Sequence, residues 1–219
     1  MFLQSDRIEA IVRKPYGVDF IKKSGEMIVS GWGENRVFII NKNKIGEPIG
    51  PDQMTQPADI AVDDDDYIYV SSKHKLQKFT SSGQLKACVG NNEANGDDLT
   101  FNDPRGITIH ENRVYVCDRN NHRIQVFNLD LDFIKSIGSY GNREGEIDAP
   151  YVKFDKAGNM YIVELGNKRV QVMDTNDQFI YTFGQSRIGN IGLPTGLHVD
   201  KDKNIVYISD FSNDRIVVY

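Results

Sequence analysis

The strongest constraint in this sequence is an internal repeat of about 46 residues. Tyr69, Tyr115, Tyr161 and Tyr207 follow one another at intervals of 46 residues, and an aliphatic residue comes directly after each. Self-similarity at a fixed period of this length is the signature of a repeat architecture, in which each repeat is one supersecondary unit. Each copy also carries one basic residue in nearly the same phase: Arg36, Lys75, Arg123, Arg169 and Arg215.

Each repeat contains four short segments with strand character. In the second copy, the segments 57–62, 67–71, 76–80 and 85–89 alternate apolar and polar residues and are separated by Asp, Ser and Gly. Four short strands within about 45 residues are typical of one blade of a β-propeller. We therefore predict an all-β fold, a β-propeller of about five four-stranded blades, as a single domain over residues 1–219.

One turn of each repeat resembles the motif of the NHL repeat. Asn121, His122 and Ile124 stand where that family has Asn, His and Leu or Ile, and the segments that lead to Arg169 and Arg215 are similar, with the histidine replaced. The second copy departs from the motif, because its turn is two residues shorter. The resemblance covers nearly the whole chain and implies NHL-type blades like those at the C-terminus of TRIM-NHL proteins.

The ends of the sequence predict how the ring of blades closes. The last copy reaches only its third strand, and residues 7–12 have the spacing of a fourth strand. An N-terminal segment, residues 1–14, that completes the last blade would leave no unpaired strand edge. We therefore expect five closed blades. The alternative is a fragment of the six-bladed ring that is usual in the NHL family.

Composition excludes several classes of protein. The chain has 31 acidic and 26 basic residues, a net charge of -5, and no apolar run of the roughly 20 residues that a membrane helix needs. This mild acidity argues against DNA as a partner and against a membrane protein. The two cysteines do not form a disulfide framework, so a reduced, cytoplasmic location is expected.

The loops on one face of the predicted propeller carry the candidate binding residues. Loops that enter the first strand of a blade and loops that join its second and third strands emerge on the same face. Basic and aromatic side chains together suit an acidic peptide, or single-stranded RNA held by phosphate contacts and base stacking. The predicted face consists of Trp32, Arg36, Lys73, His74, Lys75, Arg105, Arg119, His122, Arg123, Tyr151, Lys168, Arg169, Phe211 and Arg215.

The recurring arginines also have a purely structural interpretation, which we favour. A basic residue repeated in phase is expected to pair with the acids that recur beside it, Asp118, Glu164 and Asp210, and so to build the blade. Residues that break the repeat are better binding candidates. Trp32, the only tryptophan, is either an exposed contact anchor or packed at the rim.

Catalytic and metal-binding patterns are weak, so we predict neither catalytic residues, metal nor cofactor. The four histidines occupy different places in their repeats, and His198 with Asp19 in the predicted channel makes a poor metal site. The run 63–66 is all aspartate but lacks the glycine and distal Glu of a calcium loop, so a solvated turn is expected. Some NHL-like propellers are lyases or metal-dependent hydrolases, but their several channel ligands are not evident.

We therefore predict a non-catalytic platform that recruits protein partners through one propeller face. The alternatives are a single-stranded RNA-binding propeller and the substrate-recognition part of a TRIM-NHL-like ubiquitin ligase. The resemblance implies that ubiquitin transfer would need a RING domain, and these 219 residues hold no Cys/His zinc framework for one. A propeller lyase or hydrolase is the least favoured alternative.

Overall fold

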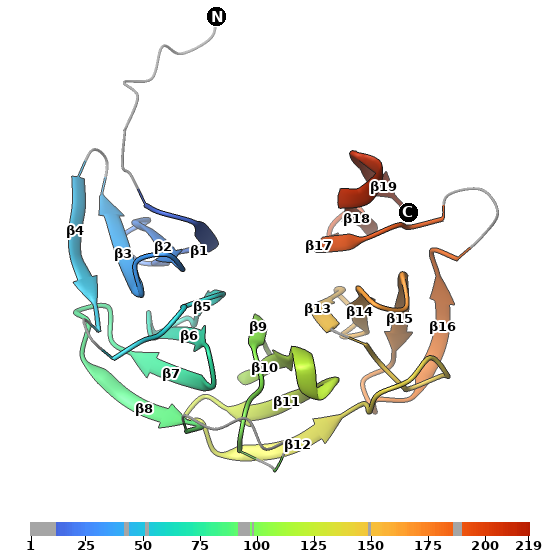
Figure 1. Ribbon diagram of the computed structural model, residues 1–219, viewed down its shortest axis with the longest axis horizontal. Coiled ribbons are helices and arrows are strands. Elements are labelled where there is room, and N and C mark those ends of the chain that lie inside the picture. The colour runs from blue at the N-terminus through green and yellow to red at the C-terminus, as the bar shows by residue number, and fades with distance from the viewer. Residues whose placement is uncertain are drawn as a thin grey trace, which may run out of the picture.

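The chain folds into five antiparallel sheets, four with four strands and the last with three. The sheets are arranged as blades around a central axis, with the first strand of each blade innermost and the last outermost (Figure 1). The predicted all-β propeller of about five blades is therefore confirmed. The computed structural model describes residues 12–41, 44–50, 53–91, 97, 99–148, 150–185 and 190–219.

The first strand of each blade lies nearest the axis, and the second strand lies beside it. They pair through antiparallel ladders, and a short connection joins them. The first strands are β1 (Pro15–Phe20), β5 (Ile60–Val62), β9 (Pro104–His110), β13 (Pro150–Phe154) and β17 (Pro194–Asp200), and the second strands are β2 (Met27–Gly31), β6 (Ile68–Ser72), β10 (Arg113–Asp118), β14 (Met160–Glu164) and β18 (Ile205–Asp210).

The third and fourth strands form the outer half of each blade. Short 3-10 turns, η1 (Arg119–Asn121) and η2 (Phe211–Asn213), precede the third strands of blades 3 and 5. The third strands are β3 (Arg36–Asn41), β7 (Lys75–Phe79), β11 (Arg123–Asn128), β15 (Arg169–Met173) and β19 (Arg215–Val218), and the fourth strands are β4 (Lys44–Ile49), β8 (Leu85–Val89), β12 (Phe133–Ile137) and β16 (Phe179–Phe183).

The hydrophobic core consists of four layers, one between each pair of successive blades. Strand alternation sends every second side chain to one side of the blade, so each blade contributes to the layer on either side of it. Between blades 3 and 4, for example, Ile124 and Val126 pack with Val152, Met160 and Ile162. The repeat therefore produces a series of equivalent interfaces.

Polar side chains near the axis also connect one blade to the next. The Ser30 hydroxyl donates to the Ala58 carbonyl, and the Ser71 hydroxyl donates to the Arg105 carbonyl at 2.6 Å. The Asp19 carboxylate accepts the backbone N–H of Val62 at 2.8 Å. The inner strands are thus joined by hydrogen bonds to buried or half-buried partners as well as by apolar contacts.

Two glycines end fourth strands in a conformation that other residues adopt at a cost. Gly138 and Gly184 have φ values of 87° and 99°. A Cβ on Gly138 would also lie 2.4 Å from Cδ1 of Ile147, which is fully buried. Both glycines therefore serve the backbone geometry at the end of a fourth strand.

The five blades form an arc whose ends, β1 and the fifth blade, lie on either side of an opening (Figure 1). The last blade stops at its third strand, as the sequence predicts. The predicted outer strand from the N-terminus involves residues 7–12, of which residues 7–11 lie outside the described part of the chain.

Within the described ranges, no helix has the length and apolar character needed to cross a membrane.

Candidate binding face

The strand pairing brings the two predicted kinds of loop to one side of the propeller. Pro104 pairs with Asp118, Pro150 with Glu164, and Pro194 with Asp210, so the start of each inner strand lies beside the end of the second strand. Entry loops and second-to-third-strand loops therefore emerge together. We call this surface the loop face.

The recurring arginines of blades 3 to 5 pair with the recurring acids. Nε of Arg123 donates to Asp118 at 2.9 Å, and Nε of Arg169 donates to Glu164 at 2.7 Å. The equivalent pair in blade 5 joins Arg215 and Asp210 at 3.0 Å. All three carboxylates are completely shielded from solvent. The structural interpretation of these arginines is confirmed, because each guanidinium group pairs with the buried acid of its own blade.

The asparagine of the motif completes the same arrangement. The Asn121 amide donates to Asp118 at 2.9 Å, and the equivalent Asn213 donates to Asp210 at 2.8 Å. Burial of the Asp210 carboxyl raises its pKa, but hydrogen bonds from Asn213, the Gly192 N–H and Arg215 outweigh that effect and hold the pKa below its usual value. We call this set of acid, asparagine and arginine the blade clasp.

Blade 1 lacks the clasp. Gly31 pairs with Arg36 where blades 3 to 5 have an acid, and Arg36 is exposed. No ion pair of Arg36 is found among the described residues. Arg36 therefore presents a cation to solvent, unlike its counterparts in blades 3 and 4.

Other predicted cations are partly neutralised. Asp103 pairs with both Arg105, at 2.9 Å, and Arg119, at 3.2 Å. Nδ1 of His122 lies 2.8 Å from the Asp148 carboxylate, and Nδ1 of His74 lies 3.0 Å from the Phe101 carbonyl oxygen. The loop face is therefore less basic than the count of its arginines predicts.

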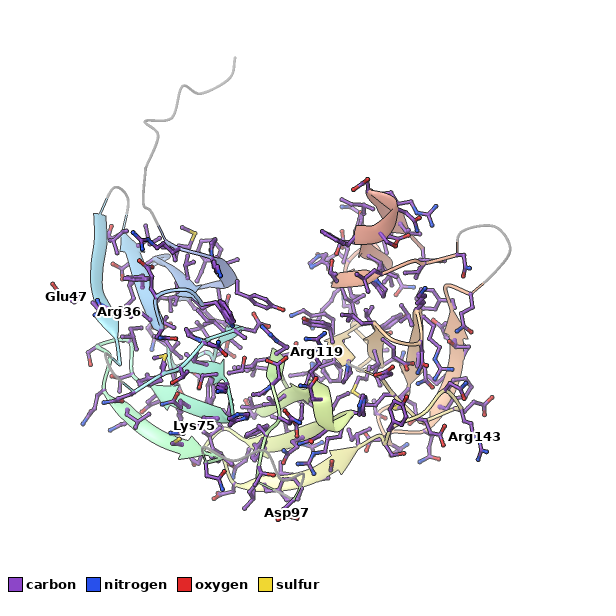
Figure 2. The ribbon with its side chains drawn as sticks, viewed as in Figure 1. Arg36, Glu47, Lys75, Asp97, Arg119 and Arg143 are labelled. Carbon is purple, nitrogen blue, oxygen red and sulfur yellow. The ribbon has the colours of Figure 1, made fainter. Side chains whose placement is uncertain are left out.

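Exposed cations remain, but they are spread out. Lys73 and Lys168 are exposed, and Lys75 is half-buried. Arg119 lies toward the middle of the arc, whereas Arg36 and Lys75 lie farther out, on other blades (Figure 2). The predicted basic residues share one face but do not form one compact patch.

Two aromatic side chains from opposite parts of the arc meet near the axis. The hydroxyls of Tyr16 and Tyr151 lie 2.9 Å apart, and the Arg105 guanidinium lies 5.1 Å from the centre of the Tyr16 ring. Burial of Tyr151, together with the nearby Tyr16 hydroxyl, raises the pKa of Tyr151. The two tyrosine side chains therefore form a neutral, aromatic part of the loop face near the axis.

The sole tryptophan is packed at the rim, one of the two alternatives predicted for it. Trp32 is half-buried, its backbone N–H donates to the Lys14 carbonyl, and the Lys14 ammonium lies 4.9 Å from the ring centre. A cation above one ring face leaves less of that ring for a ligand.

Phe211 and Tyr140 are the exposed aromatic side chains of the peripheral loops. Phe211, in η2, is 69% exposed, and Tyr140, in the loop before β13, is 71% exposed. The Tyr140 ring lies 4.5 Å from that of His122, which supports its position. Sequence reasoning found Phe211 but missed Tyr140, although an aromatic residue two positions after the fourth-strand Gly138 was a usable signal.

A polar cavity of about 560 Å³ lies on the side of the propeller opposite the loop face, where the first strands end. Its carboxylates have structural partners: Asp19 accepts the Val62 N–H, and Asp59 accepts the Ile107 N–H at 3.0 Å. Burial raises the pKa of Asp59, while the Ile107 N–H and Lys153 oppose the effect. His198 is exposed, and it is not among the residues that line this cavity.

The aspartate run forms a turn beside this cavity. Asp63 is buried and accepts the N–H of Tyr67 at 2.8 Å, while Asp64 is exposed and pairs with Lys22. The predicted turn is confirmed, although Asp63 and Asp66 are buried rather than solvated. In the described ranges, no group of three or more His, Cys, Asp or Glu side chains is arranged to hold a metal ion.

Comparison with known proteins agrees with this geometry. The family model for the NHL repeat matches residues 101–127, which include the blade 3 clasp. The chain is a β-propeller that contains an NHL repeat. Human NHL repeat-containing protein 3 is 26% identical to this NHL propeller over 203 residues, which cover 87% of the chain and 57% of the relative. The chain therefore spans less than two thirds of that relative.

Two further proteins, of different kinds, are similar to this chain, one in sequence and one in structure. RING finger protein nhl-1 of Caenorhabditis elegans is 36% identical over 80 residues, 36% of this chain and 8% of that protein. Virginiamycin B lyase from Staphylococcus aureus superposes with a TM-score of 0.74 at 15% identity, over 98% of this chain and 72% of the lyase. At that identity, the similarity to the lyase shows the fold alone.

Proposed function

We propose that this NHL propeller is a non-catalytic platform that recruits a protein partner through the loop face. The observation that carries the proposal is a pair of exposed aromatic side chains on the loop face, Phe211 and Tyr140. The recurring arginines of the same face are paired with acids in the blade clasps. Large aromatic side chains held in place on a surface are the residues that dominate protein–protein affinity. Relatives named for their NHL repeats support the same class of function.

The charge distribution favours a protein over RNA as the partner. Binding to a nucleic acid backbone needs several cations that neutralise phosphates. Arg123 and Arg169 are neutralised inside their blades, and Arg215, although exposed, is paired with Asp210. Arg105 shares Asp103 with Arg119. The remaining exposed cations are better suited to a few contacts with acidic side chains around an aromatic anchor.

The partners of the polar groups near the axis support a non-catalytic function. Asp19 and Asp59 bind backbone N–H groups of neighbouring blades, and the Lys153 ammonium donates to the Thr108 hydroxyl at 3.3 Å. Groups that connect the inner strands cannot also serve as mobile acids and bases without weakening those connections. The similarity to virginiamycin B lyase extends to the fold and supplies no residue for the reaction.

Affinity capture with face variants tests this function. Phe211→Ala and Tyr140→Ala remove the two anchors, and Tyr181→Ala is the matched control, because Tyr181 is 45% exposed on the outer strand β16. We expect a partner captured by the wild type and by the control to be lost from both face variants, at a cost of about 2 kcal/mol or more per anchor. The result should not change when the lysate is treated with ribonuclease.

An RNA titration separates the two candidate partners. A labelled single-stranded oligonucleotide is titrated with the same four proteins at several salt concentrations. Tight binding with a steep salt dependence, lost on Tyr140→Ala, would replace the protein platform with an RNA-binding face. Face variants that retain every partner of the wild type would contradict the location of the site on the loop face.

A further inference from the structure

Blade 2 lacks the acid of the blade clasp but keeps a cation in the position of the arginine. Ser72, at the end of its second strand, pairs with Lys75. Asp118 and Arg123 pair in the same register in blade 3. Ser72 is buried, and its hydroxyl donates to the Gln77 side chain at 3.1 Å. Blade 2 therefore has a lysine where the clasps of blades 3 to 5 have an arginine, and a hydroxyl where they have a carboxylate.

A glutamine on the third strand shows how the acid is normally connected to the entry loop. In blades 3 and 4 this residue, Gln125 or Gln171, donates both to the acid of the clasp and to a carbonyl oxygen of the entry loop. In blade 2 the equivalent Gln77 still donates to the entry loop, at the Gln53 carbonyl oxygen. The entry loop of blade 2 is thus held in the same way, although the Ser72 hydroxyl replaces the carboxylate beside it.

A cavity of about 300 Å³ lies at this point of the loop face. Its volume is at the lower end of the range that is typical of ligand pockets. Among the described residues, no Asp or Glu lines it. The lining comes from the end of the second strand, the shortened turn and the entry loop, and consists of Gln53, Thr55, Ser72, Lys73, His74 and Lys75.

The lysines that line this cavity have no acidic partner. No ion pair of Lys73 or Lys75 is found in the described part of the chain. Lys75 is half-buried, on the third strand of blade 2 (Figure 2), and Lys73 is exposed. An ammonium group that is partly shielded from water attracts an anion more strongly than a fully solvated one, because the solvent screens it less. The cavity therefore favours a negatively charged group.

We propose that the cavity of blade 2 binds a carboxylate group of the protein partner, supplied by an Asp or Glu side chain. The carboxylate would accept charge-assisted hydrogen bonds from the ammonium groups of Lys75 and Lys73. It would thus supply from outside the acid that blades 3 to 5 carry in their clasps. This inference rests on the proposed function, because the partner provides the acid, and it adds a second point of contact on a different blade from Phe211 and Tyr140.

A titration with a model side chain tests the site in the absence of the partner. The nitrogen-15-labelled chain is titrated at constant ionic strength with acetyl-Gly-Glu-Gly-amide, and acetyl-Gly-Gln-Gly-amide is the neutral control. We expect saturable shifts of the backbone amide signals of residues 72–75 with the glutamate peptide alone. Lys75→Met keeps the aliphatic stem and should weaken binding about tenfold. Lys168→Met, at an exposed lysine beside the intact clasp of blade 4, should have no effect.

Restoration of the acid gives a second, independent variant. Ser72→Asp places a carboxylate opposite Lys75, as in the clasps of blades 3 to 5, and should abolish binding of the glutamate peptide. Ser72→Asn has a similar shape without the charge, so it should bind the peptide as the wild type does. Circular dichroism melts establish that each variant is folded.

The outcomes separate this site from the proposed function. Absence of shifts at residues 72–75, or equal shifts with the glutamine peptide, would overturn the proposal. Saturable binding of inorganic phosphate without a response to the glutamate peptide would also overturn it and assign the cavity to phosphate. Binding of the glutamate peptide that is lost in Ser72→Asp supports the site, whatever the capture experiment with Phe211→Ala and Tyr140→Ala shows. Failure of that capture would contradict the position of the aromatic anchors alone.

Discussion

Nε of Arg169 lies 2.7 Å from a carboxylate oxygen of Glu164, and both side chains are buried. The same carboxylate accepts the amide of Gln171 at 2.7 Å. Arg169 also donates to the carbonyl oxygens of Asn142 and Arg143, so it connects the clasp of blade 4 to the entry loop of that blade. This one ion pair therefore fixes the position of two loops on the loop face.

Glu164→Ala should strongly destabilise the protein. Removal of one partner of a buried ion pair leaves the other charge uncompensated, at a cost of about 3 to 5 kcal/mol. Chemical denaturation measures this loss. Glu111→Ala, at a side chain that is 76% exposed, is the control and should change the free energy of unfolding by less than about 0.5 kcal/mol. Equal effects of the two substitutions would contradict the structural role of the clasp.

Gly138→Ala should lower the melting temperature more than Gly25→Ala. Both glycines have positive φ, 87° and 70°, so both substitutions force a side chain into the left-handed region at a cost of about 1 kcal/mol. The new Cβ at Gly138 also meets Ile147, whereas nothing lies within 4 Å of a Cβ at Gly25. Calorimetric melts of the two variants separate strain from steric conflict, and identical shifts would mean that Ile147 moves aside freely.

Ser71→Ala should destabilise the contact between blades 2 and 3. The buried Ser71 hydroxyl donates to the Arg105 carbonyl, and its oxygen accepts the Asp59 N–H at 3.0 Å. Loss of these partners leaves buried polar groups unsatisfied and is expected to cost about 1 to 3 kcal/mol. Denaturation of this variant is compared with that of Ser82→Ala, at an exposed turn residue, for which no measurable change is expected.

The stability of the protein should fall as the pH falls below 6.5, through His110. Burial lowers the pKa of His110, whose ring stacks on Phe154 at 4.2 Å, below the ordinary value of 6.5. The unfolded chain therefore takes up a proton at a higher pH than the folded chain, and folding is penalised as the pH falls through this window. Melting temperatures from pH 8 to pH 5 should fall less steeply for His110→Gln than for the wild type.

Comparison of His110→Gln with the wild type at pH 8 isolates the effect of the substitution itself from that of protonation. If His110→Gln retains the wild-type slope, the pH dependence arises from other groups and the burial of His110 does not govern it.

The blades could be predicted from the sequence because each phased residue has the same role in every repeat where it occurs. Tyr115 and Tyr161 lie in second strands and pack against the following blade, and Arg123 meets the acid that recurs five residues before it. The ion pair is local in sequence, and the packing of the tyrosines recurs with the period of the repeat, so the phase of the repeat indicates both. The positive φ of Gly138 follows from the same local geometry.

The properties of the loop face were less predictable because they depend on contacts between loops. Asp103 neutralises Arg105 and Arg119 together, and Lys14 covers one side of Trp32. None of these pairings follows from the phase of the repeat. Tyr140 is exposed in an entry loop whose length differs between copies, so alignment of the repeats did not single it out.

The blade clasp has a consequence for how such a surface can diversify. In blades 3 to 5 the acid and arginine anchor each loop within its own blade, so the residue directly after the acid is free to vary without disturbing its neighbours. That position holds Arg119 in blade 3, Leu165 in blade 4 and Phe211 in blade 5. Each of these three positions is thus held by its own blade, so a substitution at one of them should leave the loops of the other two blades in place.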